Sequence, residues 1–431
     1  MKHAKKFAIS ICVTTLLYNN CGGFKGVSGV TDLASNGSSG TPGAQPTPLP
    51  QLGVDPHPNN YPPVMGTPGA RNPETVTPVT SWPVKQAELP KIPSNFVVDD
   101  WINDSGGDTR PAHNGFDDVG AFRFICKPSH NLYDDPIVYP NQPGASHLHT
   151  FFGNTLTNNA STYSTLRQTG EGTCSGGPLN RSAYWHPALR IDDGDGNDLN
   201  DKIIMPDYAA VYYKMEPLQS TMFARGLRII FGYNMSNPAA STGFNWVCSS
   251  PQGVIRGNNS NSSLKAIADT NLCVAGDDLY IQVGAPTCWN GQLDSADHRS
   301  HVKPMQDTNL GYGACPATHP YHFPAFSLSI HFTVGPQGAA EVAKMYLASD
   351  HMPGMNMDAG STFHTDWFGA WDDDVANEWM LHADAGFGNC SGGDLCDGRG
   401  MKDPFQKTGL NGYSSLLNPA NPRVVEPPVK P

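Results

Sequence analysis

The chain has 431 residues, among them 45 glycines and 38 prolines, and only 15% of its residues are charged. This composition favours loop-rich β structure over helical bundles, which need many Glu, Lys and Ala residues. The formal net charge of −12 and the lack of a Lys/Arg cluster exclude nucleic acid as an expected partner and disfavour an anionic membrane surface.

The N-terminus has the features of an export signal. A basic start that ends at Lys6 precedes the apolar run 7–18, which is too short to span a bilayer. Cys21 follows this run and predicts a bacterial lipoprotein processing site, with ordinary signal cleavage as the alternative. We therefore expect residues 1–21 to be a signal peptide and Cys21 to carry a lipid anchor. The protein would then be an outer-membrane or cell-surface lipoprotein, or else periplasmic or secreted.

The cysteine count supports export. Of 10 cysteines, Cys12 lies in the signal and Cys21 is the candidate anchor, which leaves eight. An even number in an exported chain predicts disulfides. Cys390 and Cys396 bracket a Gly-rich loop and are the expected pair, and the partners of the others stay open. These others are Cys126, Cys174, Cys248, Cys273, Cys288 and Cys315.

Four regions follow from the distribution of apolar residues. After the signal, residues 22–95 are rich in Gly, Ser, Thr and Pro and are expected to form a disordered tether. Short apolar runs separated by turn residues fill residues 96–398. They predict one mainly β, sandwich-like domain with long disulfide-pinned loops and a few short helices. Residues 399–431 return to Pro- and Asn-rich sequence and are expected to be a tail.

Within the domain, two helices are expected, at 161–168 and 372–385. The second opens on three aspartates, whose charge suits a helix N-terminus. The Asp-rich run 192–198 lacks the Gly and Glu of a calcium loop and predicts a hairpin turn. The expected strands are 120–126, 136–139, 147–152, 183–191, 209–215, 227–233, 244–248, 279–283, 326–334 and 342–347.

The first candidate site is the stretch 134–154, where polar residues stand between prolines and glycines that fix the backbone. His147 and His149 are two apart, so both rings leave the same face of an extended segment, with Cα atoms about 7 Å apart. Together with Asp135 they are candidates for metal ligation or proton transfer. The alternative is a structural role, with both histidines hydrogen-bonded to the backbone near an Asp-Pro turn.

The second candidate site, 288–301, combines carboxylates, imidazoles, an arginine and an indole. An aspartate beside a histidine fixes the tautomer and raises the basicity of the ring, and an indole offers a flat face to a sugar ring. The alternative is a polar loop closed by internal hydrogen bonds. The residues concerned are Trp289, Asp294, Asp297, His298 and His301.

In the third candidate site, His364 and Asp366 are again two apart and aromatic residues surround them. The alternative is that Trp367 and Trp371 pack the following helix onto the sheet, which we favour for Trp371. A weaker candidate is the run 350–357, where a histidine and methionines form a set that copper favours. Methionine is more often a core filler or an exposed loop residue.

These segments together resemble a known family. The run Asp135-Pro-Ile-Val, then Pro-Gly, then Ser-His147-x-His149-x-Phe-x-Gly-Asn is similar to the signature of a secreted family of bacteria and fungi, the domain of unknown function nineteen-ninety-six. Further matching segments are 180–187, 287–302, 315–320 and 364–367.

The resemblance covers about residues 122–382, essentially the whole predicted domain. The family has no established activity, and the sugar-binding modules beside some fungal members imply a polysaccharide-facing role by association only. The Met-rich loop is not part of the resemblance, which favours the first three candidate sites over copper.

The leading hypothesis is an exported protein that acts on or binds polysaccharide or cell-envelope glycan, as a hydrolase or lyase. His147 or His149 would be the general acid/base, positioned by Asp135 or Asp297. Asp294 and Asp366 would be the carboxylate pair that ordinary glycoside hydrolysis needs. The site would be completed by His298, His301 and His364, and substrate would contact Arg181, Trp185, Trp289 and Trp367.

Two alternatives belong to other classes. In the first, the protein is a metal-binding protein or metalloenzyme, with His147, His149 and a distant histidine holding a divalent ion such as zinc or copper. In the second, it is a non-catalytic surface adhesin in which the His/Asp loops are structural. The sequence alone does not choose among the three.

Overall fold

The computed structural model describes residues 89–104, 121–214, 222–306, 315–352, 357–380, 389–390, 392–395, 399–402 and 423–431. The predicted signal 1–21 with Cys21, and the tether up to residue 88, lie outside these ranges. Within them, none of the helices has the length and apolar character needed to cross a membrane.

The larger sheet has six strands, and buried and partly exposed residues alternate regularly along one of its central strands, β15. Along β15, Phe326, Leu328, Ile330 and Phe332 are buried and the residues between them are not, so one face of the sheet points into the core. Neighbouring strands are antiparallel except β18, which pairs parallel to β2. Their order is β10 (Phe244–Ser249), β11 (Asp278–Gly284), β15 (Ala325–Thr333), β8 (Tyr208–Lys214), β2 (Ala121–Cys126) and β18 (Asn389–Cys390).

The second sheet has five antiparallel strands and carries the candidate site. In its three middle strands every residue is buried, because both faces are covered by other parts of the chain. This explains why the sequence shows little alternation there. The order is β3 (Pro128–Leu132), β4 (His149–Gly153), β5 (Ala183–Pro187), β17 (His364–Phe368) and β9 (Arg228–Gly232).

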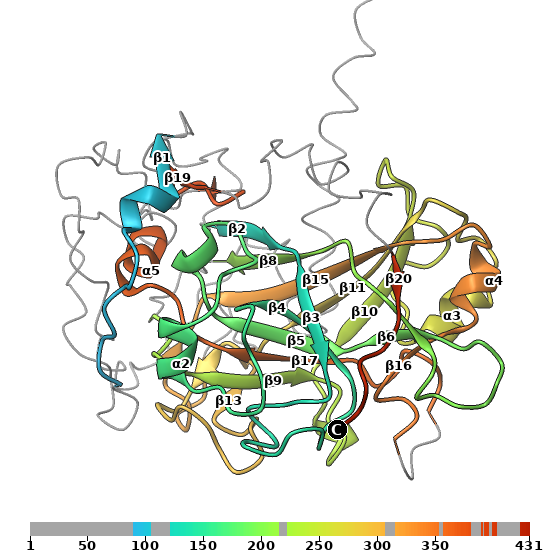
Figure 1. Cartoon of the computed structure of the whole chain (residues 1–431), viewed down its shortest axis with the longest axis horizontal. Helices are drawn as coiled ribbons and strands as arrows, with labels where there is room; N and C mark the ends of the chain where they lie inside the picture. Colours follow the sequence, from blue (N-terminus) through green and yellow to red (C-terminus); the bar gives the residue numbers. More distant parts are fainter. Residues whose placement is uncertain are drawn as a thin grey trace, which may run out of the picture.

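The two sheets pack face to face around an aromatic core. The ring of Phe326 from the larger sheet lies 6.2 Å from Tyr184, 5.4 Å from Phe231 and 5.6 Å from Trp367, all from the smaller sheet. Figure 1 shows the strands of both sheets running across the molecule. The prediction of a mainly β domain is therefore confirmed.

Smaller elements extend this core at its ends. Figure 1 shows α2 (Tyr163–Gln168) and α5 (Asp373–Met380) at one side and α3 (Leu264–Ala268) and α4 (Ala339–Val342) at the other. A four-stranded sheet joins β16 (Met345–Leu347), β6 (Leu189–Ile191), β7 (Lys202–Ile204) and β20 (Val424–Val425). The remaining strands are β12 (Cys288–Trp289), β13 (Val302–Lys303) and β14 (Tyr321–His322), and the pair β1 (Ile102–Asp104) and β19 (Arg399–Met401). Short 3-10 helices are η3 (Val98–Trp101), η4 (Gly177–Leu179) and η5 (Pro238–Ala240).

Both predicted helices form, as α2 and α5, and the described part of α5 ends at Met380. The predicted strand 136–139 is wrong, because this segment is a turn whose amides are capped by Asp135. The run 183–191 is two strands, β5 and β6, which belong to different sheets. The hairpin turn at 192–198 is confirmed, since β6 and β7 pair antiparallel on either side of it.

The fold extends past both expected boundaries of the domain. Leu89 and Ile92, placed in the predicted tether, pack against a buried cluster that includes Phe151 and Trp185. In the predicted tail 399–431, β19 pairs with β1 and β20 pairs with β7. The described residues of that segment are therefore part of the domain and do not form a free tail.

Three disulfides lie wholly within the described residues and tie loops to the sheets. They join Cys126 to Cys174, Cys248 to Cys273, and Cys288 to Cys315. Cys390 is disulfide-bonded as well, and Cys396, its predicted partner, lies outside the described residues. Disulfides persist in oxidising compartments, so these bonds indicate an extracellular protein.

Candidate functional site

Strand pairing places the first and third candidate sites on one face of the five-stranded sheet. Phe151 lies opposite Trp185, and Trp185 lies opposite Asp366, so the three residues form one row across β4, β5 and β17. His149 and His364 are each two residues from this row and therefore point to the same face. This is the outer face, away from the larger sheet.

Three imidazoles meet on this face. His149 and His364 come from strands that are two apart, about 10 Å between backbones, yet their ring centroids are only 6.3 Å apart. The ring of His147, from the loop before β4, lies 4.3 Å from that of His149 and 5.2 Å from that of His364. One ring nitrogen of each histidine lies within 4.8 Å of the other two. We call this group the histidine trio.

A glycine on the neighbouring strand holds His364 in place. Gly232 of β9 pairs with His364, and its φ of 95° lies in the region that favours glycine. A Cβ atom at this position would lie 2.6 Å from the carbonyl oxygen of Phe363 and 2.7 Å from the Cα atom of His364. The close approach of β9 to β17 therefore requires glycine here.

The Asp-Pro turn holds the loop that presents His147. Asp135 Oδ1 accepts hydrogen bonds from the backbone amides of Ile137 and Val138, each 2.8 Å long. Asp134 accepts from the amides of Gly144 and Asn159 at 3.0 and 3.1 Å. Asp134 and Asp135 therefore have a structural role in the turn. The same turn fixes the position of the loop that carries His147.

Backbone carbonyls orient two of the three rings. Nδ1–H of His149 donates to the carbonyl oxygen of Asp134 over 3.0 Å, and Nδ1–H of His364 donates to that of Thr362 over 3.0 Å. This leaves Nε2 as the lone-pair nitrogen on both rings. The Nε2 atoms of His147 and His149 are buried and have no hydrogen-bond partner. Histidines that bind metals are oriented in this way.

The trio is neutral over a wide range of pH. Burial lowers the pKa of His364 to about 3. Burial, followed by the nearby charges of His149, His364 and Lys430, lowers the pKa of His147 well below its usual range. Burial also lowers the pKa of His149, against the opposing charge of Asp135. Neutral imidazole is the form that coordinates a metal.

Two carboxyl groups adjoin His149. Atoms of Asp135, His149 and Asp366 lie within 4.8 Å of one another, and neither carboxylate oxygen of the fully buried Asp366 has a hydrogen-bond partner. Burial, then the charge of Asp135, raises the pKa of Asp366 well above its usual range, while Arg299 opposes this shift. His149 belongs to both ligand groups, but its Nδ1 is already hydrogen-bonded, so only Nε2 has a free lone pair. The two groups can therefore hold one ion through His149, and not one ion each.

The second candidate site forms its own network. His298 Nδ1 lies 2.9 Å from Asp294, and this hydrogen bond, against burial, raises the pKa of His298. His301 is buried, with Nδ1 2.9 Å from Ser295 Oγ and Nε2 2.6 Å from the carbonyl oxygen of Arg228. Asp297 accepts from the amide of Ser300 at 2.8 Å and caps the loop. Among the described residues, none of these four predicted residues joins the ligand groups around His149.

The predicted substrate contacts have structural partners. Trp185, Trp289 and Trp367 are at most 1% exposed, so none offers an indole face to a sugar ring. Trp289 stacks on Phe323 at 5.1 Å, and Arg181 donates to Asn95 and to the carbonyl oxygen of Arg167. Trp371 packs edge-on against Phe124 at 5.3 Å, as expected for a residue that anchors the following helix.

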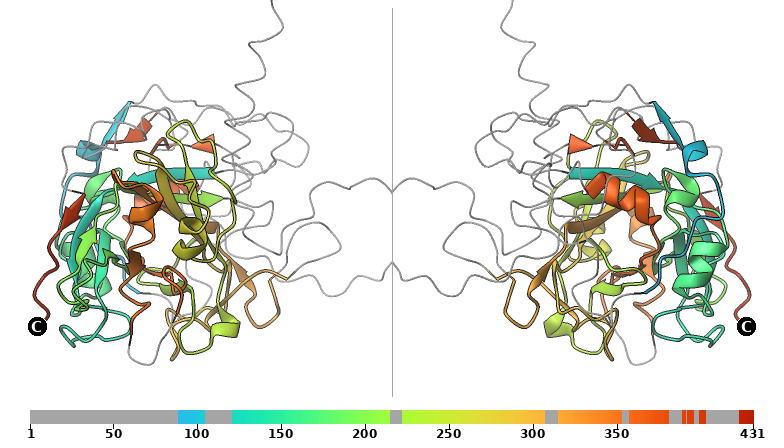
Figure 2. Two further views of the ribbon diagram at one scale, coloured as in Figure 1. Left: turned by 90° about the vertical axis from the view of Figure 1, so that its right-hand side faces the viewer. Right: turned by 90° about the vertical axis from the view of Figure 1, so that its left-hand side faces the viewer.

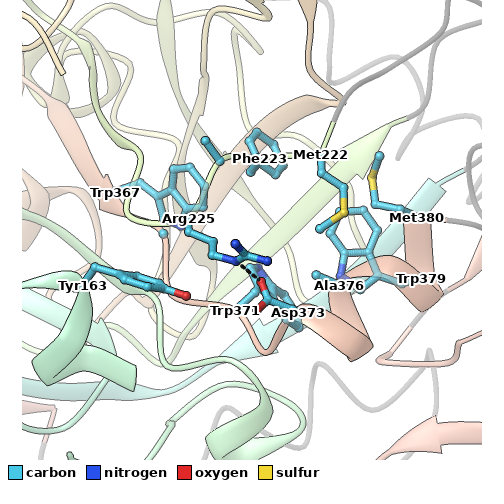
Figure 3. A pocket seen from close by; sticks show the side chains of 12 residues that line it. Tyr163, Met222, Phe223, Arg225, Trp367, Trp371, Asp373, Ala376, Trp379 and Met380 are labelled. Atoms are coloured by element: carbon cyan, nitrogen blue, oxygen red, sulfur yellow. Dashed lines mark hydrogen bonds and ion pairs between the residues drawn. The ribbon is translucent and has the colours of Figure 1, made fainter. Parts of the chain in front are cut away.

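An aromatic pocket beside α5 does not suit a ligand. Figure 3 shows Arg225 in its middle, among Trp367, Trp371 and Trp379, and paired with Asp373. The ion pair is 2.9 Å long. The free space is about 20 Å³, which is room for one water molecule.

The copper candidate lies only partly within the described residues. His351 pairs with Asp198 at 3.0 Å and stacks on Tyr346 at 4.2 Å. Residues 353–356, which include one of the methionines, lie outside the described ranges.

Sequence reasoning missed the backbone carbonyls that orient the trio and the arginine that acts on the carboxyl group beside it. The carbonyls of Asp134 and Thr362 carry no signal, because any residue supplies a carbonyl. Arg299 stands in the second candidate site but acts on Asp366 of the third, with its guanidinium held 2.7 Å from the carbonyl oxygen of Tyr233. These segments come together because Arg299 binds the carbonyl oxygens of Gly232 and Tyr233 at the end of β9, which pairs with β17.

Comparison with known proteins gives a family but no activity. No curated protein and no solved structure matches the chain. One family model matches residues 135–371, which is more than half of the chain and holds the whole histidine trio with Asp135 and Asp366. The chain belongs to the family described as Domain of unknown function (DUF1996).

Proposed function

We propose that this protein is an extracellular metal-binding protein whose histidine trio holds one divalent transition-metal ion, with zinc as the first to test. The observation that carries the proposal is the convergence of three imidazoles, of which those of His149 and His364 are buried and that of His147 is partly exposed. The rings of His149 and His364 are bonded at Nδ1, so that Nε2 is free on both. A set of three neutral imidazoles suits zinc, copper, iron or nickel.

The surroundings of the trio support a cation. In the metal-free chain, the Nε2 atoms of His147 and His149 are buried without partners, which costs free energy that a bound ion would recover. Asp135 and Asp366 lie beside His149, and their negative charge when ionised attracts a positive ion. Three protein ligands leave a fourth position open, as in catalytic zinc sites.

The test is metal analysis of protein made without a histidine tag. We expect about one ion per chain, and a higher thermal unfolding midpoint after zinc addition, because an ion that binds only the folded state stabilises it. His147→Ala, His149→Ala and His364→Ala should each lower zinc affinity by more than about 100-fold, since loss of a group that merely orients a ligand already costs 10–100-fold.

His301→Ala is the matched control, because His301 is equally buried but has partners at both ring nitrogens. This variant should lose stability yet keep the zinc-dependent rise in the unfolding midpoint. If wild-type protein neither contains an ion nor responds to zinc, copper, iron or nickel, the proposal fails.

A role in polysaccharide chemistry is the second candidate. It is supported by the Asp294–His298 pair, whose side chains are 21% and 24% exposed, so that a large substrate could reach them. A histidine with a raised pKa beside a carboxylate is suited to general acid catalysis near neutral pH.

A panel of cell-wall and extracellular polysaccharides, with product detection by mass spectrometry, tests this second candidate. His298→Ala should abolish product formation, and Asp294→Asn should reduce it, while both variants keep the zinc content of wild type. Glycan binding without product would favour an adhesin. If the protein shows no binding and forms no product, the second candidate fails for the polysaccharides tested.

A further inference from the structure

The described chain ends in a segment that runs along the edge of the domain next to the trio. We call residues 426–431 the strap. Its base is fixed: β20 pairs with β7, and the carbonyl oxygen of Arg423 accepts from the amide of Met205 at 2.7 Å. Figure 2 shows this segment, in dark red, along the outer edge of the green and teal strands.

The far end of the strap lies on the loop that carries the trio's first ligand. The ammonium group of Lys430 sits 5.2 Å from the centre of the Tyr133 ring. Pro431 lies against Gly144, where an added Cβ atom would be 3.1 Å from the proline ring. Tyr133 precedes Asp134, whose carbonyl holds His149, and Gly144 stands three residues before His147.

Between its two ends the strap spans open space. A cleft of about 500 Å³ lies beneath it, lined by Tyr133 and Leu199 on the domain and by Pro427, Pro428 and Lys430 of the strap. The strap is thus attached at its ends, and the half-buried Pro427 and Pro428 in its middle line the cleft. Two consecutive prolines keep such a span extended.

The outer attachment is weak. Val429 is 92% exposed, and Lys430 and Pro431 are exposed as well, so little apolar area is buried there. An exposed cation–π contact contributes only about 0.5–1 kcal/mol. Segments with few buried contacts open at low free-energy cost, so the outer half can detach while β20 stays paired.

His147 is the member of the trio that solvent reaches. His149 and His364 are buried, whereas His147 is partly exposed. The outer end of the strap, at Lys430 and Pro431, contacts Tyr133 and Gly144, which belong to the loop that presents His147.

We propose that the strap is a gate that limits access of ions and solvent to His147 and so slows entry and release of the metal. This inference rests on the proposed metal site for its function. The closed gate itself is a property of the metal-free fold.

The experiment compares wild-type protein with a variant that ends after Val425 and with Lys430→Ala. In metal-free protein, the rate at which diethyl pyrocarbonate modifies His147 is measured by mass spectrometry, with His298 as the internal reference. We expect modification of His147 to be about fivefold faster without the strap, which corresponds to about 1 kcal/mol of closure, and a smaller increase in Lys430→Ala. The rate at His298 should not change.

The second arm measures release of bound zinc to a coloured chelator, and we expect a similar acceleration with unchanged zinc content. Unfolding midpoints of the variants show that the fold persists. An unchanged rate at His147 in the folded truncated variant overturns the gate, even if zinc binds to wild type. If wild type binds no metal, the metal proposal fails, and the modification rates still decide whether the strap closes over His147.

Discussion

His186 and His149 show how the surroundings decide what a buried histidine can do. Both are at most 1% exposed, and the Nε2 atom of each lacks a hydrogen-bond partner. His149 lies on the outer face of its sheet beside two further imidazoles. His186 lies between the sheets, with its ring 5.8 Å from Phe152 and 5.9 Å from Phe363, and joins no ligand group among the described residues.

At this scale we predict that His186 makes the metal-free protein sensitive to acid. Burial lowers its pKa to about 3, while an unfolded chain has a histidine pKa of about 6.5. Between these values the unfolded state binds one more proton, so stability falls as pH falls, by about 1.4 kcal/mol per pH unit. His186→Phe keeps an aromatic ring in an aromatic site. It should lower the slope of the free energy of unfolding against pH by about that amount.

Urea unfolding at pH 4 to 7 measures this difference. Phe152→Leu, which alters the same aromatic site without removing a titratable group, serves as the control and should show the wild-type slope. An equal pH dependence in wild type and His186→Phe would contradict the prediction.

Among the elements, α2 and α5 are joined by a buried ion pair that the sequence does not suggest. Arg167 of α2 lies 2.9 Å from Asp372, just before α5, and both side chains are at most 3% exposed. Asp372 also caps the first turn of α5 through the amide of Asp374 at 3.1 Å. Arg167 also donates to the carbonyl oxygen of Ile92 and to Ser94 Oγ, each at 3.4 Å, so the pair contacts the segment that begins at Leu89.

We predict that Asp372→Ala lowers the free energy of unfolding by about 3–5 kcal/mol, because it leaves the guanidinium of Arg167 buried and unpaired. The exposed ion pair between Lys91 and Asp374 is the control. Lys91→Ala should cost less than about 1 kcal/mol. Urea denaturation of both variants measures the two losses of unfolding free energy. Similar losses would contradict the prediction that burial makes the Arg167–Asp372 pair the more important one for stability.

At the scale of the whole molecule, two facing sheets supply the core, and disulfides secure the long loops. The bonds differ in burial: Cys126, Cys174, Cys248 and Cys273 are at most 2% exposed, whereas Cys315 is partly exposed. A reductant therefore reaches Cys315 without opening the fold.

We predict that mild reduction under native conditions opens the Cys288–Cys315 bond first. The other two described bonds should resist until denaturant is added. Alkylation of freed thiols followed by peptide mass spectrometry measures the order. Simultaneous reduction of all three bonds would contradict the prediction and would indicate global opening.

Much of the fold could be predicted from local chemistry. Alternating apolar residues identify β15, and the three aspartates at 372–374 mark the start of α5. The expected strand 147–152 corresponds to β4, whereas β17 was not among the expected strands, because a strand covered on both faces does not alternate. The break of 183–191 into β5 and β6 was likewise not predicted, since nearly all of the run is buried and the two strands are separated by Ala188 alone.

By itself, the sequence determined that the chain is β-rich, cysteine-bonded and a member of its family, because composition, turn residues and ordered motifs are local properties. It also singled out His147, His149, His364, Asp135 and Asp366. Only the tertiary structure decided that these five adjoin while His298 and His301 form another network, because strand pairing across β4, β5 and β17 fixes which side chains share a face. Burial of Trp185, Trp289 and Trp367 was decided in the same way, since an indole that suits a sugar ring also suits a core.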